Sequence, residues 1–212
     1  MVPLIPHRLV SLGLALTLAG CGASAPLERD RYYSLAPASR ETPAERTSPA
    51  SLLVKDLAAR GFLGGRQIVY RTREQPLQVE RYELLLWEEP VPRALAQALV
   101  DAIRVARLFR AVVIPAESAR ADYQLGGEVE TFEHHPTDQP PQVVAVLDLS
   151  LVRSADRYAL WTRRYQSTEP VSGRTPEAMA DAFDRLAARL VGDVVRDLKL
   201  VQPLLIVQGD RT

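Results

Sequence analysis

The sequence predicts an α+β domain in which two amphipathic helices cover one face of a mixed, largely antiparallel sheet. Several segments alternate apolar and polar residues, and two others carry an apolar stripe at helical spacing. The chain has 212 residues, of which 47% are hydrophobic and 25% charged. This length and composition suit one globular domain with tails.

The first part of the predicted domain consists mainly of strands. The aromatic segment 32–35 predicts a short strand, and the Pro- and Ser-rich segment 36–51 predicts a mobile linker with little to bury. A further strand is expected at 52–57. After three closely spaced glycines that indicate a turn, residues 67–71 and 81–87 predict two neighbouring strands or a hairpin.

Two helices are predicted. Pro90 and Pro92 open the first, where a missing N–H does no harm, and Thr175 caps the second, with Pro176 at its first position. The apolar stripe of the first helix comprises Leu95, Ala98, Leu99, Ala102, Ile103 and Ala106. That of the second comprises Met179, Ala182, Phe183, Leu186, Leu190 and Val194.

Between the helices we expect a strand at 109–114 and then three long strands joined by turns. Alternating apolar residues predict strands at 122–133 and 143–151, and a third at 158–167. The segment 134–141 is expected to be an exposed hairpin connection. After residue 199 the tail 200–212 begins apolar and ends polar; residues 201–207 fit either an edge strand added to a neighbour or a disordered tail.

The first 20 residues predict a lipoprotein signal peptide. Arg8 precedes an apolar run at 9–18, which is too short to span a bilayer. Leu18-Ala19-Gly20-Cys21 resembles the lipobox of bacterial lipoproteins, in which the Cys thiol takes a diacylglyceryl group and cleavage frees its amine for an acyl chain. Cys21 is the only cysteine of the chain. The alternatives are a chance cysteine after an ordinary signal or a short buried helix.

The residue after Cys21 bears on the destination of the chain. Gly22 stands where Asp would be the usual inner-membrane retention signal, so we expect an outer-membrane anchor with the domain facing the periplasm. Residues 21–31 would then be a lipidated tether that reaches at most about 35 Å. The domain, expected at 32–199, would stay close to its membrane.

Composition and motifs argue against several functions. The 26 basic and 26 acidic side chains balance, which weakens a nucleic-acid interpretation. A single cysteine excludes an internal disulfide and a multi-cysteine zinc site. The sequence contains no Gly-x-Ser-x-Gly motif and no Gly-rich loop that carries a phosphate-binding lysine. We therefore expect no catalytic residues, no cofactor and no ATP hydrolysis by this chain.

His134 and His135, beside Glu133 and Asp138, form the one metal-like cluster in the sequence. Adjacent residues on a strand point to opposite faces, so the two imidazoles would not converge. We therefore favour a solvent-exposed hairpin tip and expect no metal.

Three aromatic residues are candidates for partner binding. Tyr32 and Tyr33 lie beside the expected tether, where they could form a partner or self-association edge, although core packing is equally compatible. Trp87, at a strand-to-helix corner, suits core packing better than an interface anchor. Nearby basic residues fit a solvated face or contacts to lipid phosphates: Arg66, Arg71 and Arg73.

Several of these segments together resemble one family. They are Tyr32-Tyr33-Ser34-Leu35, Arg66-Gln67-Ile68-Val69-Tyr70-Arg71, Tyr82, Trp87-Glu88-Glu89-Pro90, Leu108-Phe109-Arg110-Ala111-Val112, Ala121-Asp122-Tyr123-Gln124-Leu125 and Phe132-Glu133. In this order and spacing, over residues 31–198, the chain resembles the ABC-type transport auxiliary lipoproteins, the group that contains the PqiC lipoproteins. The Pro-rich insert after Leu35 and the apolar tail depart from the family pattern.

The resemblance implies an accessory subunit of an MCE-type intermembrane lipid transport system. Its partners would be an MCE-domain protein with its permease and ATPase, and further copies of the chain are a candidate partner. No nucleic acid is expected to bind. The chain would act as a docking adaptor at the outer membrane. The alternative is an envelope-integrity or assembly lipoprotein that is not tied to lipid transport.

Overall fold

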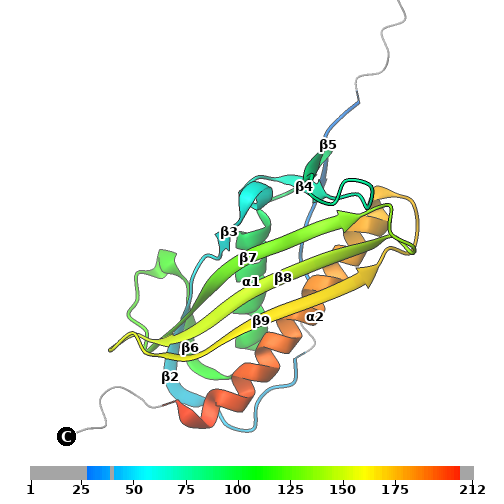
Figure 1. The fold of residues 1–212 in the computed structure, drawn as a ribbon. Coiled ribbons are helices and arrows are strands. Elements are labelled where there is room, and N and C mark those ends of the chain that lie inside the picture. The colour runs from blue at the N-terminus through cyan, green and yellow to red at the C-terminus, as the bar shows by residue number, and fades with distance from the viewer. Residues whose placement is uncertain (1–27, 39–40, 206–212) are drawn as a thin grey trace, which may run out of the picture.

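The computed structural model describes residues 28–38 and 41–205, and Cys21, the signal segment and residues 206–212 lie outside this part. The described chain forms one nine-stranded mixed sheet with both α-helices on one face (Figure 1). The predicted α+β class is therefore confirmed. The elements are β1 Arg31–Tyr33, β2 Ser48–Val54, β3 Ala58–Ala59, η1 Gly61–Gly64, β4 Gln67–Tyr70, β5 Glu80–Trp87, α1 Val91–Val105, β6 Phe109–Val113, η2 Pro115–Glu117, β7 Tyr123–His135, β8 Gln142–Arg153, β9 Ala159–Pro170, α2 Pro176–Val201 and η3 Gln202–Leu204.

β7 is the central strand of the sheet. One edge of β7 pairs with antiparallel β8 along its full length, and β9 continues this antiparallel layer. The other edge pairs in turn with three short parallel strands, β2, β3 and β4. β6 extends the sheet beyond β2, and β5 and β1 extend it beyond β4. The long pairings β7–β8 and β8–β9 and the short pairing β4–β5 are thus antiparallel, and the other short pairings are parallel.

The helices begin as the sequence predicts. Pro92 lies in the first turn of α1, and the Thr175 side chain accepts a hydrogen bond from the N–H of Ala178 at the start of α2. α2 extends to Val201 and is followed by η3, so no edge strand forms over the described residues 201–205. The residues of the predicted apolar stripes are buried, except for Ala98, which is half-buried.

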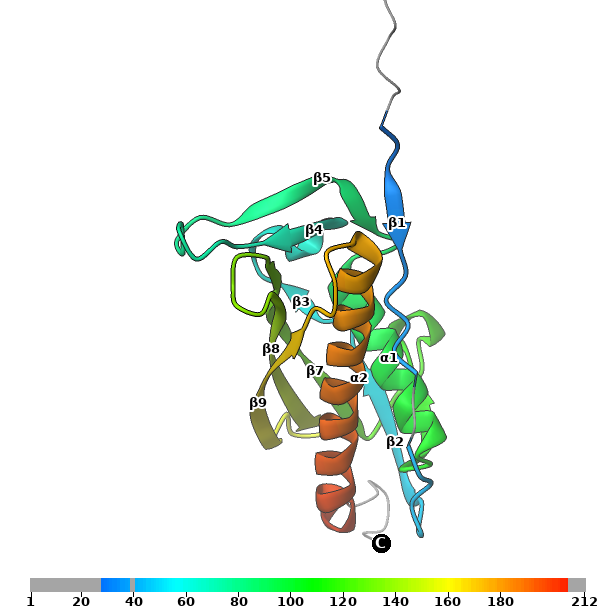
Figure 2. The ribbon, with the colours of Figure 1, turned by 90° about the vertical axis from the view of Figure 1, so that its right-hand side faces the viewer.

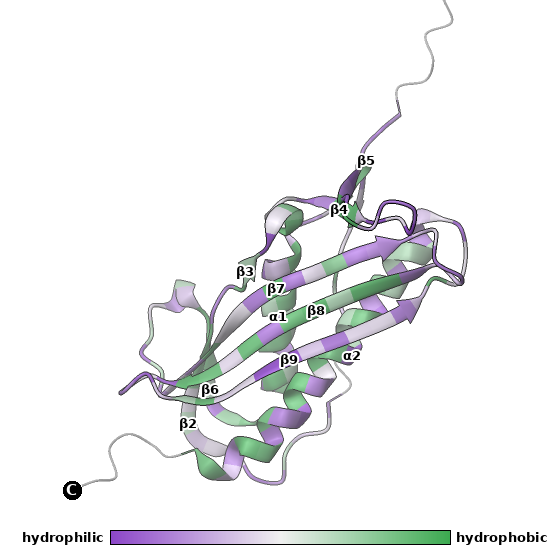
Figure 3. Ribbon diagram, in the orientation of Figure 1, coloured by the Kyte–Doolittle hydropathy of each residue, from purple (hydrophilic) through white to green (hydrophobic). Residues whose placement is uncertain are grey.

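Where these layers meet, three aromatic rings form the centre of the core. Phe183 of α2 stacks on Phe132 of β7 with ring centroids 4.6 Å apart, and Trp87 meets Phe183 edge-on at 5.3 Å. All three side chains are at most 2% exposed. In contrast, β9 is the outer antiparallel strand, and Figure 3 shows hydrophilic residues along much of it.

The linker expected at 36–51 ends earlier than predicted, because β2 already begins at Ser48. Ser51 is buried there, and its hydroxyl and backbone N–H both donate to the Asp122 carboxylate, at 2.7 and 2.8 Å. Upstream of β2, Lys199 of α2 donates to Glu41 and Gln202 donates to the carbonyl oxygen of Arg46. The segment 41–47 therefore contacts the end of α2.

Candidate functional site

The molecule has two distinct ends. At one end, called the tether end here, β1, β4, β5, η1 and the start of α2 surround the place where the N-terminal chain leaves the domain (Figure 2). At the opposite, far end lie the start of β7, the β8–β9 turn and the end of α2 (Figure 1). The candidate residues from the sequence lie mainly at the tether end.

Tyr32 and Tyr33 have different environments. The Tyr33 hydroxyl donates to the Glu177 carboxylate in the first turn of α2 at 3.1 Å, and Arg31 lies 3.8 Å from the same side chain. These contacts attach β1 to α2. Tyr32 is 54% exposed, and the Arg66 guanidinium lies 5.0 Å from its ring centroid. Of the two tyrosines, Tyr32 is thus the one available for an external contact.

Trp87 is a core residue. Its side chain is 2% exposed and packs against Phe132 and Phe183. The candidate role of Trp87 as a partner-binding residue is corrected by this burial, because a partner could not reach the indole ring without opening the core.

The three arginines do not form one cationic surface. Arg71 makes two hydrogen bonds to Glu133, at 2.9 and 3.0 Å, so its charge is neutralised within the protein. Arg73 lies 3.6 Å from Asp138, and Arg66 donates to the backbone carbonyl of Trp87. Only Arg66 and Arg73 have largely exposed side chains among the three.

His134 and His135 lie in β7 and not at an exposed hairpin tip, which corrects the sequence prediction. His134 is 9% exposed, and its Nδ1 lies 2.8 Å from the Tyr82 hydroxyl. His135 instead approaches Glu133 and Asp138, at 3.4 and 3.5 Å. Among residues 28–38 and 41–205, no group of three His, Cys, Asp or Glu side chains is placed to hold a metal ion.

Burial, together with the charge of the neighbouring His135, lowers the pKa of His134 to about 4. A histidine in the unfolded chain titrates near 6.5, so the unfolded chain binds more protons below that pH. Neutral His134 therefore makes its full contribution to the free energy of unfolding above about pH 6.5. This contribution is lost as the pH falls from about 6.5 toward 4.

We expect His134→Gln to reduce this pH dependence. Between about pH 6.5 and 4, the free energy of unfolding of the wild type should fall relative to the variant by up to about 1.4 kcal/mol per pH unit. Urea titrations of both proteins across this window measure the difference, in which the other titrating groups cancel. If the free energies of unfolding of the two proteins changed with pH in parallel, His134 could not be buried and neutral in the folded protein.

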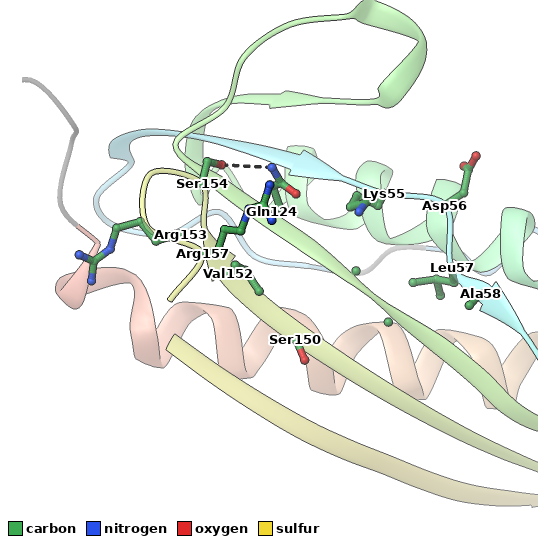
Figure 4. Close-up of a pocket in the computed structure, with 12 residues that line it drawn as sticks. Lys55, Asp56, Leu57, Ala58, Gln124, Ser150, Val152, Arg153, Ser154 and Arg157 are labelled. Atoms are coloured by element: carbon green, nitrogen blue, oxygen red, sulfur yellow. Dashed lines mark hydrogen bonds between the residues drawn. The ribbon is translucent and has the colours of Figure 1, made fainter. Parts of the chain in front are cut away.

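A groove of about 820 Å³ lies at the far end, on the sheet face turned away from the helices (Figure 4). The consecutive residues Gly126 and Gly127 leave its floor without large side chains, and Gln124 donates to the Ser154 hydroxyl beside them. Its ionisable lining residues are Lys55, Asp56, Arg153 and Arg157. The groove is therefore polar, with three cations and one carboxylate.

The groove is equipped for binding and not for nucleophilic chemistry. Its lining includes no histidine or cysteine, and the hydroxyl of Ser150 pairs with that of Thr162 at 3.0 Å. A nucleophile with an adjacent base is thus not present among the lining residues. Lys55 directly follows β2, Arg153 ends β8 and Arg157 lies in the turn after β8, which is why sequence reasoning did not bring them together. The glycine pair in a predicted strand was the one available signal.

Comparison with known proteins assigns the chain to a family. The family model described as "ABC-type transport auxiliary lipoprotein component" matches residues 33–195. The chain belongs to this family. The resemblance found in the sequence is thereby confirmed, and the family is one of transport auxiliary proteins and not a family of enzymes. No curated protein matches the sequence.

Two solved structures of bacterial proteins with TM-scores above 0.5 show the same fold. Protein XCC0632 from Xanthomonas campestris has a TM-score of 0.72 at 23% identity, over 82% of this chain and 97% of that one. The hypothetical protein CT253 from Chlamydia trachomatis has a TM-score of 0.54 at 6% identity, over 74% and 100%. The PelC dodecamer from Paraburkholderia phytofirmans has a TM-score of 0.48 at 15% identity, over 74% and 94%.

As a transport auxiliary lipoprotein, the chain is expected to be associated with a membrane. None of the helices in the described residues is sufficiently long and apolar to cross one. Membrane association through an acylated Cys21, outside the described residues, agrees with the family name.

Proposed function

We propose that this auxiliary lipoprotein is a docking adaptor for an MCE-type lipid transport system, anchored by Cys21 in the outer membrane and facing the periplasm. The observation that carries the proposal is the separation of the two ends. The N-terminal chain leaves at one end, while the polar groove lies at the other (Figures 1 and 4). An anchored domain of this shape presents the groove to the periplasm.

The chemistry of the groove favours an acidic partner segment. Lys55 and Arg157 would face carboxylates, while Arg153 is paired with Asp156 at 3.3 Å. The glycine floor would allow an extended chain to approach the β7 backbone. Large exposed apolar side chains also occur at this end, on Leu200 and Leu204, which are 70% and 68% exposed. Both features suit a protein partner better than a small metabolite.

The decisive experiment is affinity purification of the lipidated chain from detergent-solubilised membranes, followed by mass spectrometry. We expect the chain in the outer-membrane fraction and an MCE-domain protein among the recovered proteins. The double variant Lys55→Glu, Arg157→Glu should recover about tenfold less of that protein, since like charges would then face the acidic segment.

A matched charge reversal provides the control. Arg93 and Arg196 lie on the helices outside the groove, with side chains 75% and 70% exposed. The double variant Arg93→Glu, Arg196→Glu should recover the partner as the wild type does. A Cys21→Ala variant should move to the soluble fraction. Recovery of cell-wall or assembly proteins, with no MCE-domain protein, would contradict the adaptor proposal.

A further inference from the structure

Three large apolar side chains are exposed at the tether end. Leu77, in the turn between β4 and β5, is 95% exposed. Tyr32 of β1 and Phe62 of η1 are 54% and 45% exposed. Single exposed apolar side chains are common on protein surfaces. Leu77, Tyr32 and Phe62 all lie at the end of the domain from which the N-terminal chain leaves. They are called the cap residues below.

The N-terminal chain connects this end to the expected anchor over a short distance. Cys21 is seven residues from Glu28, where the described chain begins, and seven residues span at most about 25 Å. β1 pairs in parallel with the last three residues of β5, Leu85–Trp87, so the chain before Arg31 leaves the domain beside β5. In Figure 2, β4 and β5 cap the end from which this chain rises.

We propose that the cap residues rest on the bilayer surface, with Leu77 inserted at the boundary between headgroups and acyl chains. This inference rests on the acylation of Cys21 in the proposed function. It adds that the domain itself touches lipid and that its orientation on the membrane is defined. The far-end groove is then held pointing away from the bilayer.

Two contacts favour a lipid surface as the occupant. Arg66 lies over the Tyr32 ring at 5.0 Å and Arg81 over the Phe62 ring at 4.3 Å. An aromatic ring with a guanidinium beside it combines an apolar body with a cation that can reach lipid phosphates, as interfacial side chains do.

The test measures membrane depth at two leucines. Acylation blocks the thiol of Cys21, so Leu77→Cys introduces a single free thiol for a polarity-sensitive fluorophore in the lipidated full chain. Leu200→Cys, at the far end and 70% exposed, is the matched control. The proteins are reconstituted into phosphatidylethanolamine–phosphatidylglycerol vesicles with and without brominated acyl chains.

We expect quenching by brominated lipid to be at least about threefold stronger at position 77 than at position 200, because interfacial groups lie only ~5–10 Å deep. Equal, weak quenching at both positions with the protein bound to vesicles would overturn the inference and leave the adaptor proposal intact. Protection of position 77 only after addition of the MCE-domain partner would also overturn it, in favour of a protein contact. A chain that stays off the vesicles would overturn the anchor and this inference together.

Discussion

Phe183→Ala is expected to lower the free energy of unfolding by about 3–5 kcal/mol. Phe183 is fully buried and joins α2 to the sheet through the stacked ring of Phe132 and the edge of Trp87. Its removal would leave a cavity between rigid elements that cannot collapse to fill it. Urea denaturation of the mature chain without its lipid measures the effect, followed by the fluorescence of Trp87 and Trp161.

Phe62→Ala is the matched control for this substitution. Phe62 is 45% exposed, and its ring makes a surface contact with Arg81. The same truncation should therefore cost about 1 kcal/mol or less. If the two variants unfolded at the same urea concentration, the aromatic cluster could not be the centre of the core.

The local elements could be predicted from the sequence because their signals are local. Apolar residues at helical spacing and the prolines at each helix start specify α1 and α2 without reference to the rest of the chain. The antiparallel pairs β4–β5 and β7–β8 join neighbouring strands through short connections. The start of β2 was missed because the burial of Ser51 depends on a distant residue. Its hydrogen bonds are satisfied by Asp122, which lies 71 residues away in the sequence.

The position of His134 was missed for a related reason. The pairing of β7 with β8 shifts between Val129 and Thr131. Before this irregularity the buried side chains are the odd-numbered Tyr123, Leu125 and Val129, and after it they include Phe132 and His134. A bulge reverses the face on which alternate residues lie, and the alternation alone does not locate it. The far-end groove was also missed, because parallel pairing of distant strands assembles it.

Gly127→Ala should be more disruptive than its size suggests. Gly127 has a φ of +156°, and a Cβ at this position would lie 1.9 Å from the backbone oxygen of Asp148 in β8. Because the clash is with the backbone of the central antiparallel pair, no side chain can rotate to relieve it. The backbone conformation is unfavourable for an L-residue in addition. We expect a loss of at least about 3 kcal/mol in the free energy of unfolding.

The adjacent Gly126→Ala separates this mechanism from a general intolerance of β7 to side chains. A Cβ on Gly126 would meet only the Lys55 side chain, at 3.5 Å, which is an ordinary contact. Its free energy of unfolding should differ from the wild type by less than about 1 kcal/mol, since the alanine also restricts the unfolded chain. Each variant adds one methyl group to a glycine that lines the groove. A difference in their free energies of unfolding therefore reports the difference in backbone conformation and Cβ contacts at the two positions. Equal stability of the two variants would mean that β7 and β8 can separate at Gly127, and the glycine would then have to be explained by the groove it lines.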